Sequence, residues 1–340
     1  MIVVYDREEN MMKYILPFLL LLSITITGCG KEADNTTDTD NEKLNIYTTV
    51  YPLQYFTEEI GKEFVEVNTI YPPGADEHTF EPSQKDMIKL ADSDLFIFIG
   101  LGLEGFVNKA QQTLANEDVI LLPAGENIHF DETENEEHEH ADEHGVEDEH
   151  EHGDEDGHED EEHNHGDVDP HVWIDPLYAK ELALAIKKEL IKQLPEQEQQ
   201  FEENYSVLEK KLNELHTQFE EIVANAEHRE FIVSHAAYGY WETRYGLEQI
   251  SVSGLSSSSE PTQKELEKIV STAKEHDLHY VFFEQNISSK LTEIVQKEMN
   301  AKPLTLHNLS VLTDEDIKNN RTYFSIMEDN LKALETALAE

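Results

Sequence analysis

Apolar residues in the first folded part of the chain form short runs that alternate with longer amphipathic stretches. Residues 44–51 are rich in β-branched and aromatic side chains, and residues 94–100 are almost continuously apolar, as in a buried parallel strand. Between these runs the apolar positions follow a helical period. The pattern predicts strands over 44–51, 64–71, 94–100 and 118–122, and helices over 52–61, 83–92 and 103–115.

Two long helices are predicted after residue 176. Apolar side chains recur every three or four positions over 177–193 and again over 196–226, with Pro195 between the two stretches. The second helix would be ~45 Å long at 1.5 Å per residue, which is enough to run along two lobes. A second alternation follows, with strands predicted over 230–233, 249–252, 279–283 and 302–306 and a last helix over 323–339. The fold class predicted is α/β, with two lobes that contain parallel sheets and are joined by a long helix.

The N-terminus resembles an export signal that ends in a lipid-attachment motif. Met11, Met12 and Lys13 precede an apolar run that ends at Gly28-Cys29, and Ile26-Thr27-Gly28-Cys29 is similar to the bacterial lipobox. We therefore predict a signal peptide over 1–28, a tether over 29–43 and a lipid on Cys29 that holds the protein at the outer face of the cytoplasmic membrane. A plain transmembrane anchor is the alternative. The acidic residues 1–10 leave open a start at Met11 or Met12.

Composition favours a cation as the partner. The net charge of -48 repels nucleic acid and anionic lipid. Cys29 is the single cysteine, so a disulfide within the chain and a cysteine-based zinc site are excluded. Residues 129–167 hold nine of the 17 histidines among acidic residues and glycines, with almost nothing apolar. This segment predicts a disordered loop that holds several metal ions weakly.

Three of the remaining histidines stand in places where a metal site is expected. His78 lies in the loop after the second predicted strand, His235 directly follows a strand, and His171 precedes the linking helices. Ligands of open parallel sheets bind at the carboxyl ends of strands. Three imidazoles with an open or carboxylate fourth position suit Zn²⁺, although a lone histidine is more often an ordinary structural residue. His216, His228 and His276 lack such a context and are interpreted as structural.

Three segments together resemble signatures of one family. Residues 72–82 (PPGADEHTFEP), 169–176 (DPHVWIDP) and 234–241 (SHAAYGYW) are similar to those of the metal-binding solute receptors of ABC importers, in the zinc branch. The resemblance implies two α/β lobes joined by a rigid helix, with the metal in the cleft between them. It makes His78, His171 and His235 the ligands. Manganese-binding relatives carry Glu in the third motif, so His235 indicates zinc.

The family also implies a function and an organisation. The expected protein is a monomer that captures Zn²⁺ outside the cell and delivers it to a membrane permease with its ATPase, without being an enzyme itself. The corresponding domains are an N-terminal lobe over 44–175 that contains the loop 129–167, linking helices over 176–228 and a C-terminal lobe over 229–340.

The fourth ligand stays open. Many zinc-branch relatives place a metal-binding carboxylate after the last strand, where this chain has Ser310. Glu77, His307, a water, a chloride or a histidine of the loop could serve instead. Glu284 is expected to contact a ligand rather than the metal.

Other functions are weighed against this one. A zinc hydrolase would also use three histidines, but the chain contains no His-Glu-x-x-His or Gly-x-Ser-x-Gly motif. A surface adhesin or metal buffer that acts through the histidine-rich loop is another alternative. A receptor of the same family for manganese or iron is the last.

Overall fold

The computed structural model describes residues 43–130, 168–256, 259, 261–285 and 289–339. The signal peptide predicted over 1–28, almost all of the tether with Cys29, and residues 131–167 of the histidine-rich loop lie outside this part. Among the described residues, no helix combines the length and the apolar character needed to cross a membrane.

The N-terminal lobe is built on a four-stranded parallel sheet with the order β2-β1-β3-β4. All four residues of β3 are buried, as the continuous apolar run predicted. Ser83 caps α3 through its side chain and forms a capping box with Asp86. The elements of this lobe are β1 (Leu44–Thr48), α2 (Tyr51–Gly61), η1 (Lys62–Phe64), β2 (Val65–Thr69), α3 (Gln84–Ala91), β3 (Leu95–Phe98), α4 (Val107–Leu114), β4 (Ile120–Pro123) and η2 (Ala124–Asn127).

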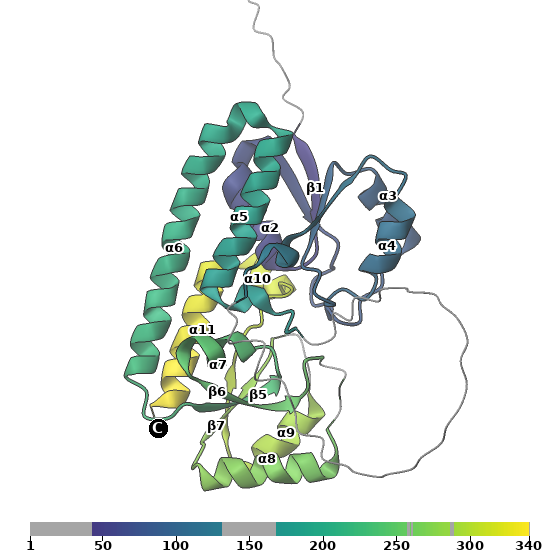
Figure 1. Ribbon diagram of the computed structural model, residues 1–340. Coiled ribbons are helices and arrows are strands. Elements are labelled where there is room, and N and C mark those ends of the chain that lie inside the picture. Colours follow the sequence, from purple (N-terminus) through teal and green to yellow (C-terminus); the bar gives the residue numbers. More distant parts are fainter. Residues whose placement is uncertain (1–42, 131–167, 257–258, 260, 286–288, 340) are drawn as a thin grey trace, which may run out of the picture. The chain divides into compact units, whose positions relative to one another are not determined.

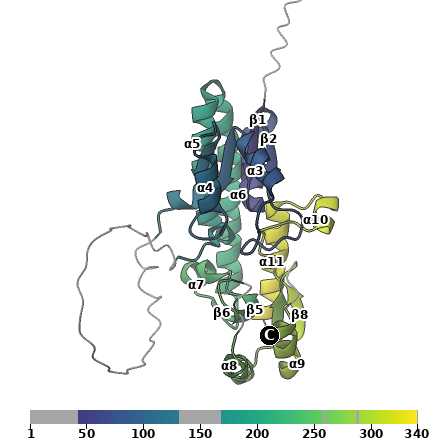
Figure 2. The ribbon, with the colours of Figure 1, turned by 90° about the vertical axis from the view of Figure 1, so that its right-hand side faces the viewer.

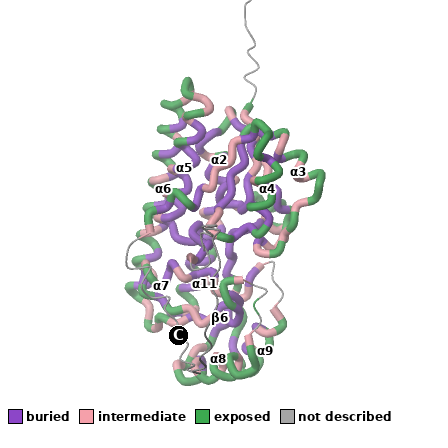
Figure 3. Tube along the Cα trace, turned by 45° about the vertical axis from the view of Figure 1, so that its right-hand side comes forward, coloured by how far each residue is buried: buried purple, intermediate pink, exposed green. Residues whose placement is uncertain are grey.

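The C-terminal lobe repeats the plan with a parallel sheet of order β6-β5-β7-β8. Side chains of β5 alternate between two cores: Phe231 and Val233 join the larger one, whereas Ile232 joins a smaller one with residues of α8 and α9. Both faces of this strand are thus buried. Figure 3 shows buried residues in the interior of the molecule and exposed ones along α3 and α8. The elements are β5 (Glu230–His235), α7 (Gly239–Tyr245), β6 (Glu248–Ser253), α8 (Gln263–Glu275), β7 (Tyr280–Phe283), α9 (Lys290–Met299), β8 (Lys302–Thr305) and α10 (Asp314–Lys318).

A long helix connects the two lobes. The 27 residues of α6 span roughly 40 Å. Near its start, the Phe201 ring lies 5.9 Å from that of Phe64 in the N-terminal lobe; near its end, the Phe219 ring lies 4.9 Å from that of Trp241 in the C-terminal lobe. Figures 1 and 2 show α6 running beside both sheets, with α5 along one half and α11 along the other. The remaining elements are η4 (Val172–Ile174), α5 (Pro176–Gln193), η5 (Pro195–Gln197), α6 (Glu198–Ala224) and α11 (Tyr323–Leu338).

The predicted α/β fold with two parallel sheets and a bridging helix is confirmed. One helix is shorter than predicted, because α4 begins at Val107 rather than at residue 103. The carboxylate of Glu104 accepts hydrogen bonds from the backbone N–H groups of Ile99 and Gly100 and from the Thr49 hydroxyl. The segment around Glu104 therefore binds the backbone and side chains just after β1 and β3 and does not form the first turn of the helix.

Candidate metal centre

Glu77 and His78 are placed by the loop that follows β2. The Tyr71 hydroxyl donates to the backbone carbonyl of Glu77 over 3.3 Å, and the backbone N–H of His78 donates to Asp76 Oδ1 over 2.9 Å. Gly74, in a left-handed conformation with φ of 72°, donates its N–H to the carbonyl of Leu312. The loop is thus fixed both to its own lobe and to the segment after β8.

His171 is held by the carboxylate two residues before it. Asp169 Oδ1 lies 2.9 Å from the backbone nitrogen of His171 and 2.7 Å from its Nδ1. With the Nδ1 proton directed at Asp169, Nε2 is the nitrogen that can bind a metal. The same segment is fixed on its other side by the Trp173 indole, which donates to the carbonyl of Asn308 over 2.7 Å.

His235 is the last residue of β5, and its Nδ1 hydrogen-bonds to Oε1 of Glu284. Glu284 directly follows β7, which pairs with β5, so neighbouring strand ends bring the two side chains together. Glu284 thus contacts His235, one of the three predicted ligands. As with His171, the contact leaves Nε2 for a metal.

The structure brings Glu77, His78, His171 and His235 into one group. One ligand atom from each of the four lies within 4.8 Å of the others, and the Nε2 atoms of His78 and His171 are 3.2 Å apart. Glu77, His171 and His235 are buried, and His78 is half-buried. Within the described part of the chain, the buried atoms Oε2 of Glu77 and Nε2 of His235 have no hydrogen-bond partner. Unpaired buried polar atoms are costly, and a bound cation would satisfy both.

Burial and mutual charge set the protonation of the group. Burial, together with the positive charges that His171 and His235 can carry, lowers the pKa of His78 to about 3. Burial also raises the pKa of Glu77. For His235, burial acts to lower the pKa, but the charge of Glu284 and its hydrogen bond outweigh this effect and raise the pKa. Because its pKa lies far below 7, His78 is a neutral imidazole at pH 7, which is the form that binds metal.

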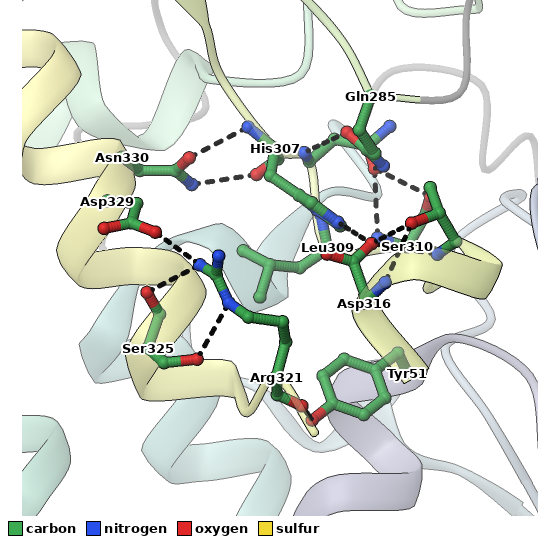
Figure 4. Close-up of polar contacts among 12 residues, drawn as sticks. Tyr51, Gln285, His307, Leu309, Ser310, Asp316, Arg321, Ser325, Asp329 and Asn330 are labelled. Carbon is green, nitrogen blue, oxygen red and sulfur yellow. Dashed lines mark hydrogen bonds and ion pairs between the residues drawn. The ribbon is translucent and has the colours of Figure 1, made fainter. Parts of the chain in front are cut away.

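His307, a candidate for the fourth ligand, does not join the group. Its Nε2 lies 3.3 Å from Oδ2 of Asp316, and its Nδ1 accepts the backbone N–H of Leu309 over 2.9 Å. Asn330 of α11 binds both the backbone nitrogen and the carbonyl of His307 (Figure 4). His307 thus fixes the loop after β8, whereas Glu77 lies with the three histidines in the group.

Two residues that hydrogen-bond to members of the group, Asp169 and Asn308, were not predicted from the sequence. Asp169 could have been recognised, because a carboxylate two residues before a metal-binding histidine can orient it. Asn308 is fully buried and donates to Glu77 Oε1 over 3.2 Å and to Glu284 Oε2 over 2.8 Å. No sequence signal marks this role, since it depends on two loops meeting in space.

Comparison with known proteins assigns the chain to a family. The family described as "Zinc-uptake complex component A periplasmic" matches residues 46–337. The chain belongs to this family. Its members are solute-binding receptors that act with ABC transporters, as the three sequence signatures implied.

Several characterised proteins are similar to the chain. The zinc-binding lipoprotein AdcA of Streptococcus pneumoniae is 33% identical over 335 residues, which cover 95% of this chain but 60% of AdcA, so the chain spans about three fifths of that relative. The high-affinity zinc uptake system protein ZnuA of Bacillus subtilis is 32% identical over 316 residues, with 93% and 94% of the two chains covered.

Solved structures give the same result. The Zn(II)-bound ZnuA-like domain of S. pneumoniae AdcA matches with a TM-score of 0.69 and 30% identity, covering 88% of this chain and all of that domain. The laminin-binding protein Lmb of Streptococcus agalactiae, described as bifunctional with adhesin and metal-transporting activity, matches with a TM-score of 0.71 and 25% identity, covering 87% and 99%.

Proposed function

We propose that the protein is an extracytoplasmic receptor that captures Zn²⁺ and delivers it to an ABC permease. His78, His171 and His235 bind the ion through nitrogen, and Glu77 supplies the fourth ligand through Oε2. The observation that carries this proposal is the buried convergence of these four side chains, in which Glu77 Oε2 and His235 Nε2 have no partner among the described residues. The zinc-binding relatives and the family support it.

The donor set favours zinc over manganese. Three imidazole nitrogens and one carboxylate oxygen match the four-coordinate preference of Zn²⁺, whereas Mn²⁺ prefers more oxygen ligands. Asp169 and Glu284 each accept a hydrogen bond from a ligand histidine, which orients the ring and increases its basicity. The alternative of a manganese or iron receptor is less consistent with this set.

The proposal extends to the parts around the site. The lobes over 44–175 and 229–340, linked by 176–228, hold the ion between them in a monomeric receptor. A lipid on Cys29 keeps the receptor at the outer face of the membrane, near the permease and its ATPase. Loop 129–167 collects ions at low affinity. Deletion of residues 131–167 distinguishes the proposed receptor from an adhesin or metal buffer that acts through the loop. After the deletion a receptor keeps one tight zinc site, whereas a buffer loses nearly all of its zinc binding.

A zinc titration tests the central assignment. In His235→Ala we expect the zinc affinity of the single tight site to fall by more than about 100-fold, while weak zinc binding by the loop remains. A residue that only hydrogen-bonds to a ligand would cost less than this when it is removed. The matched control is His276→Ala, because His276 pairs with Glu230 outside the group. One tight zinc per chain in His235→Ala would contradict the proposal.

A further inference from the structure

A chain of hydrogen bonds joins two of the proposed ligands behind the metal position. It runs from His235 Nδ1 to the carboxylate of Glu284, from that carboxylate to the side-chain amide of Asn308, and from the same amide to Glu77 Oε1. The remaining polar side-chain atoms of its two end residues, His235 Nε2 and Glu77 Oε2, are the buried atoms of the group without a partner among the described residues. The chain therefore determines which atom each ligand presents to the ion.

The orientation of the Asn308 amide is fixed by its oxygen. Oδ1 accepts from Gln285 Nε2 over 3.0 Å, from the Ser310 backbone N–H over 3.1 Å and from the Ser310 hydroxyl over 2.9 Å. Figure 4 shows Gln285 and Ser310 close to His307 at the loop after β8. A flipped amide would place its NH₂ group against these donors and its oxygen against two carboxylates. Both amide hydrogens consequently point at Glu77 and Glu284.

This arrangement restricts how Glu77 can bind a metal. Oε1 accepts a hydrogen bond from Asn308, whereas Oε2 is unpaired. A carboxylate that is held in this way offers one oxygen, which gives four ligand atoms with the three histidines. Release of Oε1 would allow two-oxygen binding and a higher coordination number, which suits Mn²⁺ better than Zn²⁺.

We infer that Asn308 is a positioning residue that confines Glu77 to binding through one oxygen and thereby sets the preference of the site for Zn²⁺ over Mn²⁺. Ser310 supports this role by donating to Asn308 Oδ1. The inference rests on the proposed function, because it needs Glu77 to be a ligand. It adds a determinant of selectivity that does not itself touch the ion.

The test compares Asn308→Ala with the native full-length protein in two measurements. Co²⁺ absorbs visible light several times more strongly in four-coordinate sites than in five- or six-coordinate sites, so we expect the band to weaken at least twofold in the variant. The spectrum of His235→Ala, which keeps the histidine-rich loop, is subtracted from both. Competition between metals should show the ratio of Zn²⁺ to Mn²⁺ affinity falling about tenfold, the scale expected for loss of an outer partner of a ligand.

The matched control is Asn330→Ala. Asn330 fixes the same loop through the backbone of His307 but does not contact Glu77. An equal loss of the Co²⁺ band in this control would mean that loop shape, not the amide, sets the coordination, and the inference would be wrong. If Asn308→Ala does not fold, Asn308→Ser takes its place, since one hydroxyl proton cannot serve two carboxylates.

A double variant separates the mechanism from general destabilisation. In a Glu77→Ala background, Asn308→Ala should change the affinity ratio by less than about twofold, because Asn308 acts through Glu77. An unchanged band and ratio in Asn308→Ala, with tight zinc in the native protein, overturns this inference alone. Absence of tight zinc binding in the native protein overturns the proposed function and the inference together.

Discussion

The Nε2 atoms of His78 and His171 face each other at 3.2 Å, although the two residues come from segments 93 positions apart. The contact of His171 Nδ1 with Asp169 leaves Nε2 as the nitrogen that faces His78. Burial helps to keep His78 neutral at pH 7. Such a pair can share one proton or one cation, and under the proposed function it binds the cation together with Glu77 and His235.

Asp169→Asn should weaken zinc binding about 10- to 100-fold, because the carboxylate orients His171 and increases its basicity. Competition with a chelator of known affinity measures the change. Glu181→Gln is the matched control, since Glu181 also contacts a histidine, His129, but outside the group. Equal zinc affinity in native protein and Asp169→Asn would show that Asp169 does not tune the ligand.

Zinc should stabilise the fold. An ion that binds only the native state adds about 2.7 kcal/mol at a free concentration of 100 times Kd, and here it also pairs Glu77 Oε2 and His235 Nε2. Thermal unfolding with stoichiometric and excess zinc, and after chelation, measures the shift. His171→Ala should lose the part of the shift that saturates at one equivalent. An identical rise in that variant would assign the stabilisation to other sites.

Trp173→Phe should lower the free energy of unfolding of the metal-free protein by about 2–4 kcal/mol. Trp173 is fully buried, and its indole N–H binds the carbonyl of Asn308, so the change leaves a small cavity and an unpaired carbonyl. Urea unfolding followed by circular dichroism measures the loss. Val207→Ala, at an exposed position of α6, should stay within about 0.5 kcal/mol of the native value. A similar loss in both variants would contradict this explanation.

Asp316→Asn should lower stability at pH 7 by about 1 kcal/mol, because a neutral amide oxygen accepts more weakly than the carboxylate from the N-cap residue of α10 and from His307. The hydrogen bond from His307 holds the pKa of Asp316 well below its usual range. A lowered pKa in the folded state stabilises the protein fully above the unfolded pKa of about 3.9, and this stabilisation is lost progressively as pH falls from there through the lower folded pKa. The difference between native protein and variant, measured by urea unfolding at pH 7 and pH 3, should therefore shrink in acid. A constant difference would exclude a role for the charge.

The sequence determined most of the architecture because strand and helix patterns are local. The continuous apolar run over 94–100 contains β3, and the helical spacing over 196–226 contains α6. The three histidines were singled out because they lie at predicted strand ends or just before the linking helices, in short segments that resemble the signatures of one family. Helix ends were less predictable: the start of α4 depends on Glu104 binding the ends of two strands, which no local pattern shows.

Tertiary structure decided which candidate side chain joins the three histidines and which residues lie behind the group. From sequence, Glu77, His307, a water, a chloride and a loop histidine were all open, although His307 was more readily explained as a turn residue. The fold turns His307 toward Asp316 and Glu77 toward the three histidines, and it places Asn308 between Glu77 and Glu284. These outcomes depend on how three loops from two lobes meet, because side-chain direction and hydrogen-bond partners over such separations are set by packing rather than by local sequence.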